Sequence, residues 1–345
     1  MRLGILTGGG DCPGLNAVIR AAVVRTIRTH DGMMLGFPDG WRGLIENRVR
    51  ELDLKSVAGA LPRGGTLLGT SRVDPFRESG GVGAIQEAIA SHELQALIVC
   101  GGDGTLSAAA RLAEAGAPVI GVPKTIDNDV HGTDYSLGYD TALTTVMRAI
   151  DALHSHAESH DRVIVVEVMG RNAGWLALGA SIAGGGDVVV APELPMSIEG
   201  VCNCIRSRSA RGRDFSIVVV AEGAAFLPEP DHHTFAAPFR NDAVGRKLYG
   251  GVGELVALEI ERRLGVETRT VNLGYVQRGG TPSAFDRMLG TRMGLHAVDL
   301  AVRGEVNRMV CARGSQVTSV ELSVVLRGTR MADPELIDAA RVFFG

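Results

Sequence analysis

The feature that most constrains the fold of this chain is a series of short apolar runs, each ending in a glycine-rich or polar loop. The runs are continuous rather than alternating, which is typical of strands buried on both faces of a parallel sheet. Segments with helical spacing lie between them, and this alternation predicts an α/β fold. The predicted strands are 3–6, 94–100, 118–122, 162–168, 187–191, 215–221 and 268–275, and the predicted helices are 14–29, 105–115, 140–157, 173–183 and 253–264.

The length of 345 residues favours two domains over one, because a single hydrophobic core rarely grows so large. A polar, turn-rich break near 138–140 is the best candidate for a boundary. The last βα unit could return to the first domain, which the spacing alone leaves open. Three segments are predicted to be irregular: 59–83, 224–245 and the tail after 313.

Composition excludes several classes of function. The net charge of −4 gives no basic footprint for nucleic acid. No apolar stretch approaches the ~20 residues that span a bilayer, and the N-terminus has no signal-like pattern. The five cysteines are scattered and odd in number, so we expect a reduced, cytoplasmic protein in which Cys202 and Cys204 are structural.

Charged side chains recur shortly after the predicted strands. Ligands of doubly wound sheets bind outside the carboxyl ends of the strands, so these side chains are candidates for a site. A solvated layer of polar loops would give a similar picture, but it would less often combine glycines with a single acid or arginine. The candidates are Asp11, Arg72, Asp103, Lys124, Asp127, Asp129, Arg171, Glu222 and Arg278.

Two glycine-rich turns, "GGGDCPG" (8–14) and "GGDGT" (101–105), each join a strand to a helix. Free backbone N–H groups and a helix N-terminus there can hold phosphate. Neither turn is a P-loop or a clean dinucleotide fingerprint. Each alone could be a plain strand–helix turn, but together, after strands expected to be neighbours, they favour an extended polyphosphate.

The acids near these turns suggest a metal and a base. Asp103 among phosphate-binding amides would repel phosphate unless a cation lay between, and Mg²⁺ often binds one or two carboxylates plus phosphates, with Asp129 as a second contact. The alternative is that Asp103 caps the following helix. Asp127 could accept the proton of an attacking alcohol, while Arg72, Arg171 and Lys124 neutralise charge. The alternative for "TIDND" is an Asx-turn.

Lysine itself is informative in this chain. Only Lys55, Lys124 and Lys247 are lysine among 35 basic residues, so the chain strongly prefers arginine. Lys124 therefore indicates a site that requires an ammonium group. A flexible ammonium could follow a phosphoryl group from donor to acceptor better than a planar guanidinium could.

The motifs "GGGDCPGLNA", "GGDGTL", "PKTIDND", "GTDYSLGYDTA", "VIVVEVMGRNAGW" and "LGYVQRGGTPSAFDR" resemble the phosphofructokinase family, in order, from residue 2 to about 300. "PKTIDND" and the arginine-rich style are most similar to its actinobacterial branch. The resemblance implies phosphoryl transfer to the 1-hydroxyl of fructose 6-phosphate, with Mg²⁺. It also implies two Rossmann-like domains with largely parallel sheets and the active site in the cleft between them. The larger domain, 1–138 plus about 251–300, would hold the donor and magnesium, and the smaller, 139–250 plus the C-terminal tail, the sugar phosphate.

The resemblance also implies roles for individual residues. Asp127 would be the general base, assisted by Arg171, Thr125 and Lys124, and Asp103 and Asp129 would bind the metal. Arg162 and Arg269 would reach the 6-phosphate of a neighbouring subunit, which implies a homo-oligomer, usually a tetramer. The donor would contact Gly10, Arg72, Gly102, Asp103, Gly104 and Thr105, and the sugar phosphate Thr125, Asp127, Arg162, Met169, Gly170, Arg171, Glu222, Arg269, Tyr275 and Arg278.

The chain departs from the family pattern at three places. Tyr275 stands where many members have histidine, so it brings no positive charge to the 6-phosphate. Leu54, Arg211, Arg213 and Asp187 occupy places of effector ligands, and Leu54 replaces an arginine there, which argues against nucleotide activation.

The third departure concerns the phosphoryl donor. Gly104 is the small residue associated with ATP, whereas Lys124 is carried by pyrophosphate users. The actinobacterial branch combines both residues in ATP users, so we expect ATP. The alternatives are a pyrophosphate-dependent phosphotransferase and a non-catalytic sugar-phosphate-binding paralogue.

Overall fold

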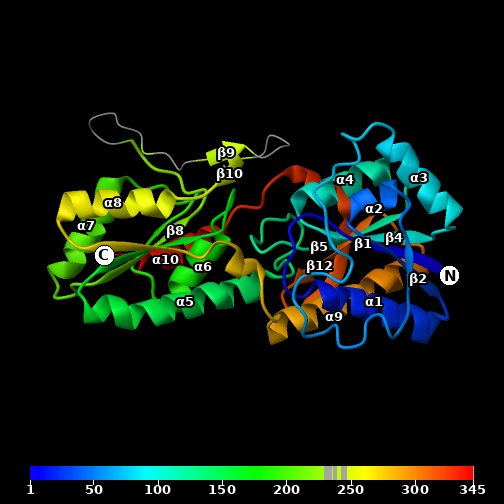
Figure 1. Cartoon of the computed structure of the whole chain (residues 1–345), viewed down its shortest axis with the longest axis horizontal. Coiled ribbons are helices and arrows are strands. Elements are labelled where there is room, and N and C mark those ends of the chain that lie inside the picture. Colours follow the sequence, from blue (N-terminus) through cyan, green and yellow to red (C-terminus); the bar gives the residue numbers. More distant parts are fainter. Residues whose placement is uncertain (229–234, 236–238, 242–246, 345) are drawn as a thin grey trace. The chain divides into compact units, whose positions relative to one another are not determined.

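The computed structural model describes residues 1–228, 235, 239–241 and 247–344. It divides into two compact units, the first made of Met1–Thr141 with Arg278–Thr329 and the second of Ala142–Gln277 with Arg330–Gly345. Each unit is an α/β layer structure with helices on both faces of its main sheet (Figure 1).

The first unit contains a seven-stranded sheet in the order β13-β12-β5-β4-β1-β2-β3. The five central strands are parallel, and the two edge strands pair antiparallel. Helices α1 and α9 run along one face and α2, α3 and α4 along the other (Figure 1). The elements are β1 (Arg2–Thr7), α1 (Leu15–His30), β2 (Met33–Phe37), α2 (Trp41–Ile45), β3 (Arg50–Leu52), α3 (Gly81–Ser91), β4 (Ala96–Gly101), α4 (Asp103–Glu114), β5 (Val119–Pro123), α9 (Ala284–Val302), β12 (Arg308–Arg313), β13 (Gln316–Glu321) and the 3-10 turn η2 (Leu322–Arg327).

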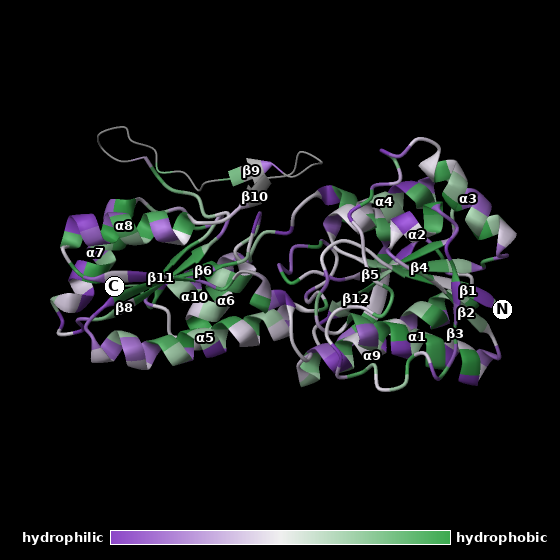
Figure 2. Ribbon diagram, viewed as in Figure 1, coloured by the Kyte–Doolittle hydropathy of each residue, from purple (hydrophilic) through white to green (hydrophobic). Residues whose placement is uncertain are grey.

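The second unit contains a four-stranded parallel sheet in the order β11-β6-β8-β7. Strands β6, β7 and β8 are almost wholly apolar and buried, because helices cover both faces of the sheet (Figure 2). The edge strand β11 is mostly polar and only partly buried. The elements are α5 (Tyr139–Ser159), β6 (Val163–Val168), α6 (Trp175–Gly184), β7 (Val188–Val190), α7 (Ile198–Ser209), β8 (Ser216–Ala221), the antiparallel pair β9 (Phe239–Asn241) and β10 (Lys247–Tyr249), α8 (Val252–Leu264), β11 (Thr268–Asn272), the 3-10 turn η1 (Gly274–Arg278) and α10 (Pro334–Arg341).

The α/β prediction is confirmed, and all seven predicted strands and five predicted helices are present within a few residues. The last predicted strand ends earlier, at Asn272, because the chain turns into η1 before Tyr275. The tail after 313 is not irregular: it forms β13, η2 and α10. Segment 59–83 has only turns, bends and irregular backbone until α3 begins at Gly81, as expected, and most of 224–245 lies outside the described residues.

The boundaries of the two units differ from the expected division. Residues 252–277 belong to the second unit because β11 pairs with β6 and α8 packs beside both. Residues 301–329 belong to the first unit because β12 pairs with β5.

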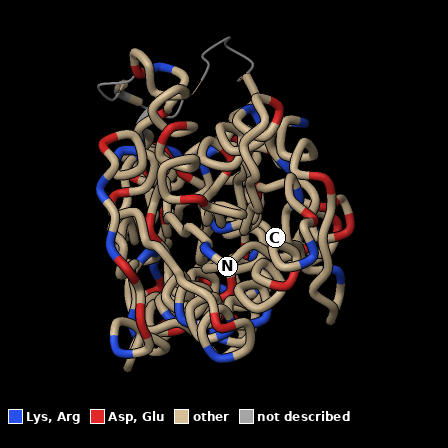
Figure 3. The backbone as a smooth tube through the Cα atoms, turned by 90° about the vertical axis from the view of Figure 1, so that its right-hand side faces the viewer, with Lys and Arg blue, Asp and Glu red and all other residues tan. Residues whose placement is uncertain are grey.

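Two general features of the chain follow from its helices and its charges. Within the described residues, no helix has the length and apolar character needed to cross a bilayer. Figure 3 shows acidic and basic residues interspersed along the chain rather than gathered by sign.

Candidate active site

Three loops of the first unit meet at one edge of its sheet. β4 lies between β1 and β5, and all three strands run parallel. From β1 the sheet grows in two directions: β2 lies on one side of β1, and β4 followed by β5 lies on the other side. Ligands of α/β sheets bind at such a point, where the strand order reverses. The loops that follow these strands, 8–14, 101–105 and 124–129, carry most of the predicted donor and catalytic residues.

The two glycine turns are packed against each other by Thr105. A Cβ at Gly8 would lie 2.7 Å from the Thr105 side chain, and one at Gly101 would lie 2.3 Å from it. Both positions therefore require glycine. The Gly8 N–H donates to the Cys100 carbonyl at 2.9 Å, which fixes the first turn to the end of β4. The prediction that the two turns are neighbours is confirmed.

Arg72 and Asp103 lie on the rim of these turns. The Gly9 N–H donates to the Ser71 carbonyl at 3.0 Å, so Ser71 contacts the first glycine turn. Arg72 is the next residue in the chain, and it is exposed. Asp103 is the first residue of α4, and the N-cap position is Gly102, which has no side chain to serve as a cap. The alternative that Asp103 is the N-cap is therefore wrong. Asp103 and Gly104 are both exposed.

The loop after β5 is shaped by Thr125, Asn128 and Ser136. The Thr125 hydroxyl accepts the Asp127 N–H at 3.1 Å, and the Ser136 hydroxyl donates to the Thr125 carbonyl at 2.6 Å. Asn128 is buried with φ of 52°, and its Oδ1 accepts the Ser136 N–H at 2.8 Å. These hydrogen bonds within the loop show that Asn128, which lies between Asp127 and Asp129, fixes the shape of the loop. The sequence motif predicted Asn128 only as a turn-forming residue and gave no sign of the contact with Ser136.

The carboxylates of this loop lie close to one another. Burial raises the pKa of Asp129 to about 7, and the charges of Asp127 and Asp103 add to this effect, while a hydrogen bond from Thr125 opposes it. The buried Asp129 Oδ1 has no hydrogen-bond partner within the described residues. An orphaned carboxylate oxygen beside two further acids fits a divalent cation. No group of three or more acid, histidine or cysteine ligands forms a metal site in the described part of the chain, so phosphate oxygens would complete the coordination.

Two cations lie against the first glycine turn. Lys124 is 2% exposed, and its ammonium donates to the Gly10 carbonyl. Burial lowers the pKa of Lys124, and the nearby Arg278 lowers it further. A Cβ at Gly10 would lie only 2.7 Å from Arg278 Nη1, so the guanidinium packs on this turn. Within the described residues, Lys124 forms no ion pair with a carboxylate, which leaves positive charge for an anionic ligand.

In the second unit, a loop after β6 carries Met169, Gly170 and Arg171. Gly170 has φ of 137°, which only glycine readily adopts, and the Gly223 N–H donates to its carbonyl at 3.1 Å. The Glu222 N–H donates to the Val168 carbonyl at 2.8 Å. These contacts bring four predicted sugar residues together at the carboxyl ends of β6 and β8: Met169, Gly170, Arg171 and Glu222.

Arg162 and Arg269 lie at the other end of the same sheet. Arg162 precedes β6, and Arg269 lies near the amino-terminal end of β11, in register with Ile164. The Glu267 carboxylate accepts from Arg162 Nε at 2.7 Å and also binds the Arg269 guanidinium. The structure therefore brings these two arginines together but separates them from the loop 169–171 of their own chain.

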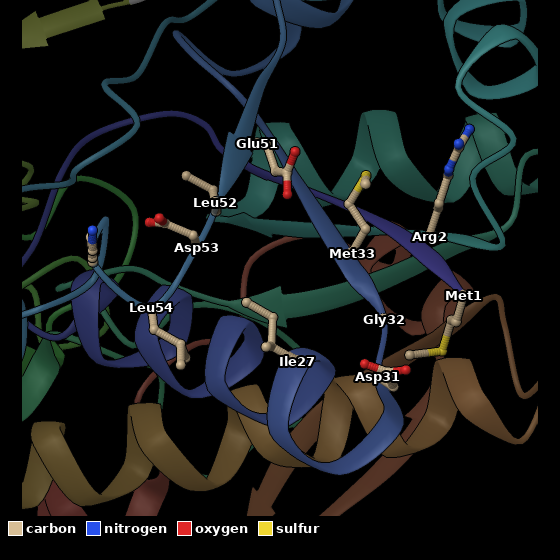
Figure 4. Close-up of a pocket in the computed structure, with 11 residues that line it drawn as sticks. Met1, Arg2, Ile27, Asp31, Gly32, Met33, Glu51, Leu52, Asp53 and Leu54 are labelled. Carbon is tan, nitrogen blue, oxygen red and sulfur yellow. The ribbon is translucent and has the colours of Figure 1, made fainter.

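Three other positions singled out in the sequence lie outside these groups of residues. Tyr275 lies on η1 and is 72% exposed. Asp187, at the place of an effector acid, instead forms an ion pair of 2.8 Å with Arg208. Leu54 lines an open pocket of about 630 Å³ with Met1, Ile27, Met33 and Leu52 (Figure 4). This pocket lies where β1 and β2 begin, so it is at the opposite edge of the sheet from the catalytic loops.

Asp286 of α9 is a buried acid that sequence reasoning missed. Its carboxylate accepts the N–H groups of Gly138 and Thr141 at 2.9 and 2.8 Å, and the Thr141 hydroxyl as well. It thereby fixes the end of the loop that starts at Thr125 and the beginning of α5. The only sequence signal was its place in "TPSAFDR", far from the residues that it holds.

Asp286 should make stability depend on pH. Burial raises the pKa of Asp286 to about 6, so the folded state holds this proton more tightly than the unfolded state. Its contribution is therefore fully present below about pH 4 and lost as pH rises through about 6. We expect the free energy of unfolding of the wild type, relative to Asp286→Asn, to fall by on the order of 2–3 kcal/mol from pH 4 to pH 7 in urea titrations. Asp338→Asn, at an exposed site, is the control; a difference between wild type and Asp286→Asn that does not change with pH would contradict this account.

Glycine turns beside acids at a switch point form the kind of site that enzymes of phosphoryl transfer use. A family model described as phosphofructokinase matches residues 2–301. The chain belongs to the phosphofructokinase family.

Similar proteins agree with this assignment. The chain is 49% identical, over the full length of both proteins, to a pyrophosphate--fructose 6-phosphate 1-phosphotransferase of Streptomyces coelicolor. It is 47% identical, again over both full lengths, to an ATP-dependent 6-phosphofructokinase of Mycobacterium tuberculosis. Among solved structures, a Pichia pastoris phosphofructokinase has a TM-score of 0.84 at 29% identity, covering 99% of this chain and 39% of that longer one.

Proposed function

We propose that this chain transfers a phosphoryl group from ATP to the 1-hydroxyl of fructose 6-phosphate, with Mg²⁺, to give fructose 1,6-bisphosphate. The observation that carries the proposal is the grouping of Asp103, Asp127 and Asp129 beside two adjoining glycine turns and the buried ammonium of Lys124. Acids alone would repel a polyphosphate, and cations alone would not activate an alcohol.

The first unit would bind the donor and perform the proton transfer. Backbone N–H groups of the glycine turns, with Arg72, would hold the phosphates. Asp103 and Asp129 would hold Mg²⁺, which neutralises charge on the transferring phosphoryl group. Asp127 would accept the proton of the sugar 1-hydroxyl, and its backbone is already fixed by Thr125.

The second unit would bind the sugar phosphate. Met169, Gly170, Arg171 and Glu222 converge at the carboxyl ends of two adjacent strands, which suits a small polar ligand. Arg171 can bind phosphate oxygens through its planar guanidinium. Arg278 was expected to bind the 6-phosphate, and its contact with Gly10 would have to be exchanged for this role.

The positions of Arg162 and Arg269 support a homo-oligomer, and we propose a tetramer. Arg162 and Met169 flank the six residues of β6, so seven residue steps of about 3.3 Å place them about 23 Å apart. An arginine side chain cannot span that distance to the sugar loop of its own chain. A second copy can supply both arginines instead, and Glu267 holds them side by side for it.

The donor is the point on which similar proteins differ. Names of relatives at 46–49% identity include both ATP-dependent and pyrophosphate-dependent enzymes. Gly104 favours ATP, because it is exposed at the start of α4 and has no side chain to fill the nucleotide's space. The buried Lys124 at the first turn is the observation that favours pyrophosphate as the alternative.

Assays with each donor test the proposal. Purified protein with fructose 6-phosphate and Mg²⁺ should consume ATP at a rate well above that with pyrophosphate. Turnover with pyrophosphate but not with ATP would establish pyrophosphate as the donor. Absence of turnover with both donors, despite binding of fructose 6-phosphate, would instead establish a non-catalytic paralogue, which the intact Asp103, Asp127 and Asp129 argue against.

Lys124→Arg should lower turnover more than it weakens sugar binding. Lys124 is 2% exposed and its ammonium already contacts the Gly10 carbonyl, so the larger guanidinium would have to displace its buried surroundings. We expect kcat to fall by about tenfold to a hundredfold while KM for fructose 6-phosphate changes by less than about threefold. Steady-state kinetics measure this, with Lys55→Arg at an exposed position as the control. The reverse pattern, a raised KM with kcat unchanged, would make Lys124 a sugar-binding contact.

A further inference from the structure

Gln277 is a fully buried amide that uses both of its ends. Its Oε1 accepts the backbone N–H of Met169 at 3.1 Å, and its Nε2 donates to the carbonyl of Gly274 at 3.1 Å. The two partners are a donor and an acceptor, so the orientation of the amide is fixed by chemistry. No apolar side chain could satisfy either partner, and burial makes an unsatisfied backbone group costly.

The two segments that Gln277 joins both carry proposed sugar-phosphate ligands. Met169 begins the loop that contains Gly170 and Arg171. Gly274 begins η1, which carries Tyr275 and ends at Arg278. Gln277 thus connects, by two hydrogen bonds, segments more than one hundred residues apart in the chain.

The neighbouring hydrogen bonds between β11 and β6 show which part of the chain Gln277 joins to the loop after β6. Before the turn, the Leu273 N–H donates to the Glu167 carbonyl at 3.1 Å, and Asn272 Nδ2 donates to the Glu167 carboxylate at 2.9 Å. These bonds hold the end of β11 on β6 but do not reach η1. The link through Gln277 is made further along, at the start of the loop that carries Gly170 and Arg171.

We propose that Gln277 is a positioning residue, which sets the geometry of the sugar-phosphate subsite by holding the Met169 loop and the 274–278 turn together. This inference rests on the proposed function. Gln277 does not itself touch the sugar in this account. Its effect should therefore fall on the binding of fructose 6-phosphate and only weakly on the chemical step.

Gln277→Glu provides a sharp test because it changes one atom. An ionised carboxylate still accepts the Met169 N–H but opposes the Gly274 carbonyl with a second acceptor. A protonated carboxyl group can donate to that carbonyl, and burial favours protonation. At pH 8 we expect KM for fructose 6-phosphate to rise about tenfold or more, with kcat changed by less than about threefold. As pH falls towards about 5.5, KM should return towards the wild-type value.

The control is Gln86→Glu. Gln86 also donates through Nε2 to a backbone carbonyl, that of Ala115 at 3.0 Å, but on the exposed face of α3. The ionisable residues on the two joined segments, Glu167, Arg171, Tyr275 and Arg278, are present in every variant, so their titration cancels in the comparison with wild type. A KM in Gln277→Glu that stays at the wild-type value at all pH values, or that responds as Gln86→Glu does, overturns the proposal.

A second measurement does not depend on turnover. Backbone hydrogen exchange over 169–174 should be faster in Gln277→Leu than in wild type, and unchanged in Gln86→Leu. An equal exchange rate in Gln277→Leu and wild type overturns the proposal. If the wild type neither binds nor converts fructose 6-phosphate, the proposed function fails, while this comparison still decides whether Gln277 holds the loop.

Discussion

Asp127→Asn is expected to lower kcat for phosphoryl transfer by about a hundredfold to ten-thousandfold, the usual contribution of a general base. The amide cannot accept the proton of the sugar 1-hydroxyl, but it has the shape of the carboxyl group. The Thr125 hydroxyl would still accept the backbone N–H of residue 127, so the loop should keep its form. KM for fructose 6-phosphate should therefore change by less than about fivefold, because the loss falls on the transition state.

Asp134→Asn is the matched control on the same loop. The Asp134 carboxylate binds Arg313 at 2.9 Å and the Gly314 N–H at 2.7 Å, on the outer side of the unit. Its replacement should affect stability but leave kcat within about twofold of wild type, as is usual for exposed ion pairs. Should Asp127→Asn keep more than a tenth of wild-type turnover, Asp127 would not be the base.

Loss of both Arg162 and Arg269 should raise KM for fructose 6-phosphate by about a hundredfold or more, because each charge-assisted hydrogen bond contributes about 1.5–3 kcal/mol. The double variant Arg162→Ala/Arg269→Ala should keep its fold, since both side chains are at least partly exposed and bind the same surface carboxylate of Glu267. Steady-state kinetics over a wide range of fructose 6-phosphate concentration measure the effect. Glu267→Gln controls for loss of that carboxylate.

Mixed oligomers then show whether the arginines act on a neighbouring subunit. In a hybrid of Asp127→Asn chains with the arginine double variant, an intact base and intact arginines can meet only across an interface. If each site pairs two chains, an equal mixture should regain about one quarter of wild-type activity. Hybrids that assemble and stay inactive would show that both arginines serve their own chain, contrary to the separation along β6.

Buried parallel strands were the part of the fold most readable from sequence. Ile98 and Val218 stand in continuous apolar runs because helices cover both faces of their sheets, and such runs are distinctive. The hairpin of β12 and β13 was missed because its second strand is half-exposed and carries polar residues on a sheet edge. Helix α9 was missed because its buried residues, among them Gly290, Met293 and Gly294, do not form a simple apolar stripe.

The candidate site was predictable where it depends on strand ends. Asp103, Lys124 and Asp127 follow neighbouring strands, and parallel strands bring their carboxyl ends to one edge. Contacts between distant segments were not predictable, since nothing local marks the bond between Gln277 and Met169 or that between Asp286 and Gly138. The packing of Arg278 on Gly10 is of the same kind.

The central claim is that the chain moves the terminal phosphoryl group of ATP to the 1-hydroxyl of fructose 6-phosphate. Phosphorus NMR of a reaction with ATP, Mg²⁺ and fructose 6-phosphate follows donor and product in one sample. We predict that ADP and fructose 1,6-bisphosphate appear in equal amounts, and that neither forms with Asp127→Asn on the same time scale. A spectrum in which ATP stays intact while pyrophosphate phosphorylates the sugar, or in which ATP releases only inorganic phosphate, would contradict the account.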